Sequence, residues 1–196
     1  MTGSDFLAPA VFAGLSANIF LQLGMGIRQA VDNESSVSGS SLPVLVPHFC
    51  AFLFSTLVLS TAFIALRFTP LLGFFEYLFV FPAAVMLHSL LECFLPGLAA
   101  GKKRVSGWPS GGASSGVACF LILSLAASFA DAVFLSLGFA FGILFAVIAA
   151  GEIKRRAGME AVPPSLRGAP LSLIAMGLLS LVCSSLAAVF FEVLGK

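Results

Sequence analysis

Long stretches of apolar residues, separated by short polar segments, run along the chain from end to end. The stretch 44–66 is the clearest, since it contains one histidine and no charged residue. About 20 consecutive apolar residues are enough for a helix that crosses a bilayer. The pattern therefore predicts six transmembrane helices, at residues 6–27, 44–67, 70–95, 114–130, 132–151 and 169–194.

Two of these spans come from nearly one apolar block, residues 116–150, which only Asp131 interrupts. One helix of about 35 residues would exceed the length that a bilayer requires. The pattern favours two short crossings with a tight turn at Asp131. Within the third span Pro82 interrupts the helix, whereas Pro170 stands near the start of the last span, where helices accept proline.

Composition supports a membrane protein. The chain is 59% hydrophobic and 10% charged, and its mean hydropathy is +1.09, well beyond the balance of soluble domains. A net charge of +1 gives no indication of a nucleic-acid partner. We therefore expect one all-α membrane domain, residues 1–196, in contact with lipid.

No motif for catalysis or metal binding stands out. The four cysteines lie singly inside apolar stretches, without the paired spacing of a zinc site or a disulfide framework. Buried free cysteines commonly act as small apolar residues. Nucleotide-binding loops, nucleophile elbows and HExxH motifs are also missing from the sequence. We do not expect the chain to be catalytic on its own.

The basic residues predict an orientation. Loops 28–43, 96–113 and 151–168 follow the first, third and fifth spans, so all three lie on one side. Positively charged loops stay in the cytoplasm, which places both termini outside. Eight of the ten basic residues are in these loops: Arg28, Lys102, Lys103, Arg104, Lys154, Arg155, Arg156 and Arg167.

The two halves of the chain, about 1–98 and 108–196, each contain three predicted spans. Each half opens with small and polar residues, GLSAN at 14–18 and GGASSG at 111–116. An odd number of spans makes two such repeats inverted relative to one another, and such folds place broken helices near the midplane. The sequence thus points to an inverted repeat with broken first and fourth helices.

Polar residues inside spans are candidates for function. His88 and Glu92 lie one helical turn apart in the third span and are candidates for an ion pathway. The alternative is a hydrogen-bonded pair near the cytoplasmic surface, without a transport role. The small residues of GLSA (14–17), LGMG (23–26) and LGFAFG (137–142) predict close helix packing.

The last two spans resemble a known family. LSLGFAFGILFAVIAAGEIKRR and AVPPSLRGAPLSLIAMGLLSL, within residues 135–181, are similar to the end of the RnfA/NqrE family of membrane proteins from Rnf and Nqr complexes. Looser matches precede them in order, at SANIF (16–20), LGMG (23–26), LLEC (90–93), WPS (108–110) and SFADA (128–132).

The resemblance implies a function. It implies a six-span, inverted-repeat subunit of a complex that couples NADH or ferredoxin oxidation to Na⁺ or H⁺ translocation across a bacterial inner membrane. It also implies other complex subunits, among them a homologous partner of opposite topology. Two cysteines from each of the pair would hold a [2Fe-2S] cluster.

This chain departs from the family at the cluster positions. Gly26 and Ser115 stand where the resemblance places cysteines, and Cys119, one turn after Ser115, is the alternative ligand. Clusters favour thiolates. We expect a complex subunit whose cluster is absent or altered. Two alternatives stay open, a stand-alone small transporter that uses His88 and Glu92, and a purely structural membrane subunit.

Overall fold

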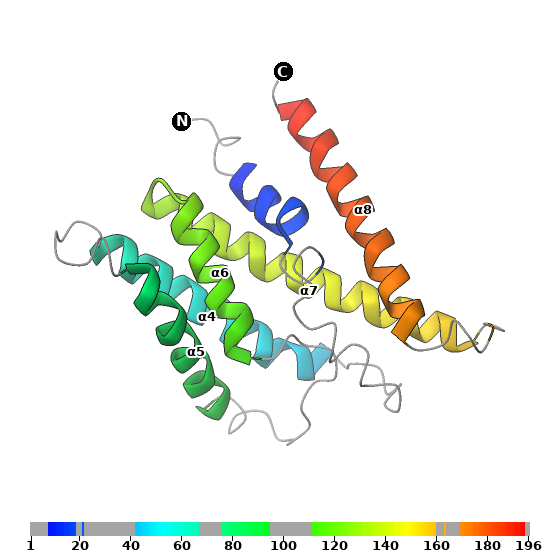
Figure 1. Cartoon of the computed structure of the whole chain (residues 1–196), viewed down its shortest axis with the longest axis horizontal. Coiled ribbons are helices and arrows are strands. Elements are labelled where there is room, and N and C mark those ends of the chain that lie inside the picture. The colour runs from blue at the N-terminus through cyan, green and yellow to red at the C-terminus, as the bar shows by residue number, and fades with distance from the viewer. Residues whose placement is uncertain are drawn as a thin grey trace.

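A computed structural model describes residues 8–18, 21, 42–66, 76–94, 111–159, 163 and 169–194. Every regular element within these residues is helical, which confirms the predicted all-α class (Figure 1). The elements are η1 (Phe12–Ser16), α4 (Leu42–Leu66), α5 (Glu76–Phe94), α6 (Gly111–Leu125), α7 (Phe129–Met159) and α8 (Ala169–Leu194). The predicted loops 28–43 and 96–113 lie largely outside the described part, whereas the prediction of a loop from residue 151 is wrong, because residues 151–159 are the last turns of α7.

Three of the described helices are long and apolar enough to cross a membrane. Their spanning parts are His48–Leu66 in α4, Phe129–Ile153 in α7 and Pro170–Glu192 in α8. The 31 residues of α7 correspond to about 46 Å, more than the roughly 30 Å of a bilayer's hydrocarbon core. The apolar parts of α5 and α6 are shorter, at Leu78–Leu91 and Gly112–Leu125.

The predicted turn at Asp131 is wrong, because the chain turns earlier, between Leu125 and Phe129. The N–H of Ser128 donates to Asp131 Oδ2 at 3.0 Å, and the N–H of Asp131 donates to Ser128 Oγ at 3.2 Å. This is a capping box, in which an acid in the first turn satisfies the N–H group of the cap residue. The charge therefore belongs to the first turn of α7.

Pro82 does not interrupt the third helix, contrary to the prediction. α5 is a continuous helix from Glu76 to Phe94 with Pro82 inside it. Proline removes one backbone donor, and membrane helices accommodate this through local adjustments. The last helix, by contrast, has the predicted bounds, 169–194, and α4 begins two residues before its prediction and ends one residue before it.

α4 lies at the centre and packs on α5, α6 and α7. It is antiparallel to α7: the hydroxyl oxygens of Ser60 and Ser136 are 3.3 Å apart, and the rings of Phe49 and Phe141 are 5.4 Å apart. α5 and α6 cover α4 on one side, and η1 lies on α7 (Figure 1). The packing thus forms one interior shared by helices of both halves.

Of the three helices long enough to cross a membrane, α8 is the least buried. It contacts η1 and α7, and near its end the ring of Phe191 lies 6.4 Å from that of Phe12, edge to face. An apolar helix surface of this kind is what a bilayer solvates. The exposed large side chains of α8 include Leu173, Ile174, Leu178, Leu181, Val182, Leu186 and Val189.

Candidate functional site in the helix interior

Polar side chains gather in the interior rather than on the helix surfaces that face outward. In an apolar environment each such group needs a hydrogen-bond partner, and polar residues of this kind are candidates for function. Two groups matter here: the η1–α7 junction, built around Asn18, and the polar cluster, formed by Ser55, Thr56, His88, Ser115 and Cys119 from α4, α5 and α6.

At the η1–α7 junction the first helix ends inside the protein. Its last turn is a π-helix, closed by the N–H of Ala17, which donates to Phe12 O at 2.8 Å. Asn18, 1% exposed, then caps the end. Its Nδ2 donates to Gly14 O at 3.0 Å and to Gly142 O at 2.8 Å, while its Oδ1 accepts from the N–H of Leu21 at 3.3 Å.

Glycines let η1 and α7 meet backbone to backbone. A Cβ added to Gly138 would lie 2.9 Å from Ala10 Cα, and one added to Gly142 would lie 2.8 Å from Gly14 Cα. Carbon atoms normally pack at about 3.5–4.0 Å. The predicted close packing of GLSA and LGFAFG is therefore confirmed, while LGMG lies outside the described residues.

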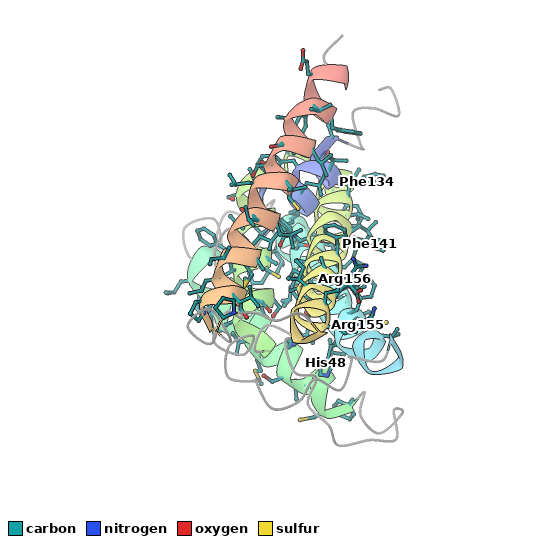
Figure 2. All side chains as sticks on the ribbon, turned by 90° about the vertical axis from the view of Figure 1, so that its right-hand side faces the viewer. His48, Phe134, Phe141, Arg155 and Arg156 are labelled. Atoms are coloured by element: carbon teal, nitrogen blue, oxygen red, sulfur yellow. The ribbon has the colours of Figure 1, made fainter. Side chains whose placement is uncertain are left out.

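An apolar groove of about 400 Å³ opens beside this junction. Its floor includes Gly14 and Gly138, and the phenyl rings of Phe134, Phe141 and Phe145 form part of its wall on α7. Figure 2 shows Phe134 and Phe141 following one another along the same edge of α7. None of the described residues that line the groove is charged, so these residues offer apolar contacts.

In the polar cluster, His88 of α5 is fully buried against α4. Its Nδ1 lies 3.3 Å from Ser55 Oγ, and Ser55 Oγ donates to Phe52 O at 2.9 Å. Thr56 also bonds the carbonyl of Phe52, at 2.9 Å. His88 is thus in the interior, as an ion-pathway candidate would be. Glu92 follows one turn later in α5, and its side chain lies outside the described part.

The two described cluster-ligand candidates, Ser115 and Cys119, face the same interior from α6. Ser115 Oγ donates to Gly112 O at 2.8 Å and to Ala84 O at 3.4 Å, so its hydroxyl joins α6 to α5. Cys119 Sγ lies 4.0 Å from Thr56 O and is fully buried. Both side chains are thus used in helix packing.

These residues do not fit an iron–sulfur cluster. Gly26, the other expected cluster position, lies outside the described part. At the expected cluster position that is described, Ser115 has a hydroxyl that bonds backbone carbonyls, whereas a cluster would require an accessible thiolate there.

Charged side chains form a group of ion pairs at the C-terminal end of α7. Beyond the apolar part of α7, Glu152 Oε1 accepts from Arg155 at 2.8 Å and from Arg156 at 2.9 Å. The hydrogen bond to Glu152 raises the pKa of Arg155 above its usual value, so this guanidinium stays charged. His48, near the start of α4, lies at the same end (Figure 2).

Sequence reasoning missed the role of Asn18, which stood out only as part of the SANIF segment. The sequence did carry a signal, an asparagine between apolar neighbours, because a side-chain amide inside a membrane must find hydrogen-bond partners. The comparisons with known proteins add no identity: no family model, no curated protein and no solved structure matches this chain.

Proposed function

We propose that the chain is a six-span subunit of an Rnf/Nqr-type electron transport complex in a bacterial inner membrane. In such a complex, oxidation of NADH or ferredoxin drives Na⁺ or H⁺ across the membrane. The chain is not catalytic alone and works beside a homologous subunit of opposite topology. The resemblance of residues 135–181 motivates this proposal, and one structural observation carries it.

That observation is the pattern of helix contacts. An inverted repeat exchanges η1 with α6, α4 with α7, and α5 with α8. Under this exchange the contact of α4 with α5 corresponds to that of α7 with α8, and the contact of α4 with α6 to that of α7 with η1. The contact of α5 with α6 corresponds to that of α8 with η1, and all six contacts are present. The α4·α7 contact exchanges with itself, and these two helices are antiparallel, as inversion requires. The α6·α7 contact has no counterpart among the main helix contacts of the described residues.

The charges support the N-out, C-out orientation. Arg155 and Arg156 extend from the end of α7 that lies beside the start of α4, and the positive-inside rule favours the cytoplasm for this end. Phe12 and Phe191, near the two ends of the described chain, are in ring contact with one another. Same-side termini agree with an even number of spans.

We propose further that this subunit has no cluster of the family type. The Ser115 hydroxyl is committed to the carbonyls of Gly112 and Ala84, and Cys119 is enclosed against α4. The polar cluster then has a structural role, and the subunit completes the membrane part of the complex. No electron-transfer step is assigned to its residues.

Purification of the complex through a tag on this chain tests both statements. We expect flavin and iron–sulfur subunits to co-purify, together with a homologous membrane protein. In low-temperature electron paramagnetic resonance of the reduced complex, Cys119→Ala should leave the cluster signals unchanged. A [2Fe-2S] signal lost in Cys119→Ala, but kept in the matched variant Cys183→Ala on α8, would overturn the statement about the cluster.

The break at Asn18 favours a second candidate, a stand-alone transporter. Inverted-repeat transporters bind substrate where broken helices expose backbone groups near the midplane. Asn18 closes such a break against α7. Purification distinguishes the candidates, because a transporter would elute without redox subunits, and this result would overturn the first proposal.

A further inference from the structure

One face of α7 connects the apolar groove to the charged end of the helix. Residues three or four positions apart lie on the same face of a helix. Ile148 follows Phe145, a lining residue of the groove, by three positions, and Glu152 and Arg156 follow at two further steps of four. Phe145 and Ile148 are exposed, so the face is open between the groove and the charges. Figure 2 shows Arg156 below Phe141 on α7.

The ion pairs hold two guanidinium groups back toward the membrane. Arg155 and Arg156 bond the carboxylate of Glu152, three and four positions earlier, at 2.8 and 2.9 Å. Side chains of a helix lean toward its N-terminus, and here that direction leads into the bilayer. Both guanidinium groups therefore lie near the level of Glu152. Two positive charges share one negative charge, so the group keeps a positive charge.

This group has accessible hydrogen-bond donors. Arg155 bonds Glu152 through Nε and Nη2, and Arg156 bonds it through Nε. The two arginine side chains are 62% and 71% exposed, so other N–H groups of each fork can be reached from outside. Guanidinium groups bind phosphate oxygens through paired N–H groups of this kind.

The distance from these charges to the groove corresponds to one leaflet of a bilayer. Half of the hydrocarbon core is about 15 Å thick, which equals about ten residues of helix. Gly142 stands ten positions before Glu152, and it lines the groove together with Phe141 and Phe145. An apolar chain whose charged head lies at the arginines would therefore end in the groove.

We propose that this face of α7 binds one anionic phospholipid of the surrounding bilayer. Its phosphate lies against Arg155 and Arg156, and one acyl chain follows Ile148 and Phe145 into the groove between α7 and η1. The positive charge favours an anionic lipid, because a zwitterionic headgroup has a positive charge of its own. The inference does not rest on the proposed function, since it requires only these two helices and a bilayer.

The exposed apolar side of α8 provides a comparison within the same protein. It is as apolar as the face of α7, but the only charged residue in the sequence of α8 is an acid, Glu192. Lipid that merely solvates the protein would contact both helices alike. Lipid that is bound by the arginines would prefer α7.

Native mass spectrometry of the full chain, titrated with phosphatidylglycerol or phosphatidylcholine of the same acyl chains, tests the headgroup site. We expect one phosphatidylglycerol to bind more tightly than phosphatidylcholine. Arg155→Gln with Arg156→Gln should weaken its binding about 30-fold, at about fivefold for each basic residue. The control, Arg67→Gln with Lys196→Gln, removes two positive charges elsewhere in the sequence and should leave the binding unchanged. Equal affinities for the two lipids, or equal losses in the two double variants, would overturn the proposal.

A phosphatidylglycerol with a photoreactive diazirine at the end of one acyl chain tests where the chain lies. After illumination, peptide mass spectrometry should find the label mainly around Gly142 and Phe145, and the double arginine variant should lose this preference. The same probe with a choline headgroup should label α8 positions such as Leu178 as much as α7. Labelling by the phosphatidylglycerol probe that is spread evenly over α7 and α8 would overturn the proposal.

Discussion

Gly142→Ala should destabilise the protein, because this position supports both the packing and the hydrogen bonding of η1. The added Cβ would lie 2.8 Å from Gly14 Cα, whereas carbon atoms pack at about 3.5 Å or more. The two backbones must therefore separate by about 0.7 Å at this point. The three atoms nearest to the added Cβ are all backbone atoms of Gly14, so no side chain can rotate away to relieve the overlap.

Overpacking of this kind costs about 1–3 kcal/mol. The separation also lengthens the hydrogen bond from Asn18 Nδ2 to Gly142 O, which is 2.8 Å long in the unsubstituted protein. Alanine itself favours the helix by about 1 kcal/mol over glycine, which offsets part of the loss. Gly177→Ala isolates this gain, because an added Cβ on Gly177 in α8 meets nothing within 4 Å.

Unfolding in mixed detergent micelles, titrated with sodium dodecyl sulfate, measures both free energies. We expect Gly142→Ala to be less stable than Gly177→Ala by about 1–3 kcal/mol. Combining Gly142→Ala with Asn18→Ala should cost less than the sum of the two, since both changes weaken the same contact. If Gly142→Ala were as stable as Gly177→Ala, the close approach of η1 and α7 would be refuted.

Two further changes test how the helix ends are held. Asn18→Ala removes three hydrogen bonds of about 0.6–1 kcal/mol each and should lower the free energy of unfolding by about 2–3 kcal/mol in the same titration. Asn18→Asp, which is equal in size, should cost more, because it turns a carboxylate toward two carbonyl oxygens. An Asn18→Asp variant as stable as the original protein would contradict this assignment of the hydrogen bonds. Ser128→Ala removes the cap of α7 and should lower the free energy of unfolding by about 1 kcal/mol. The control is Ser124→Ala, an exposed serine whose hydroxyl bonds Leu121 O within α6, and it should change the free energy of unfolding by less than about 0.5 kcal/mol. Equal effects of the two changes would argue against the capping box.

Helix positions were largely predictable, because an apolar run long enough to cross a bilayer permits few other structures. The bounds of α8 agree with the prediction, and those of α4 differ by one or two residues. The junction between α6 and α7 was misplaced because Asp131 was interpreted only as a charge. The spacing of Ser128 and Asp131 is itself a capping signal and would have placed the turn correctly.

Contacts between distant segments were less predictable. The glycines of 137–142 indicated a close approach, but nothing in their pattern names η1 as the partner. Asn18 and Gly142 are 124 positions apart, and their hydrogen bond depends on the path of every helix between them. In the same way the sequence indicated His88 as a polar residue inside a span, but its contact with Ser55 could be predicted only with knowledge of how α4 and α5 pack.

The position of η1 has a consequence for the synthesis of the protein. Its packing surface on α7 is made about 125 residues after Gly14, and ribosomes add about 5–20 residues per second. The first helix must therefore wait roughly 6–25 s for its partner, with Asn18 already in the membrane or held at its surface. A segment whose Asn18 amide lacks its partner on α7 is a poor anchor for that interval. The insertion machinery would have to hold the first helix at the membrane until α7 is made. The order of synthesis is therefore part of how this fold forms.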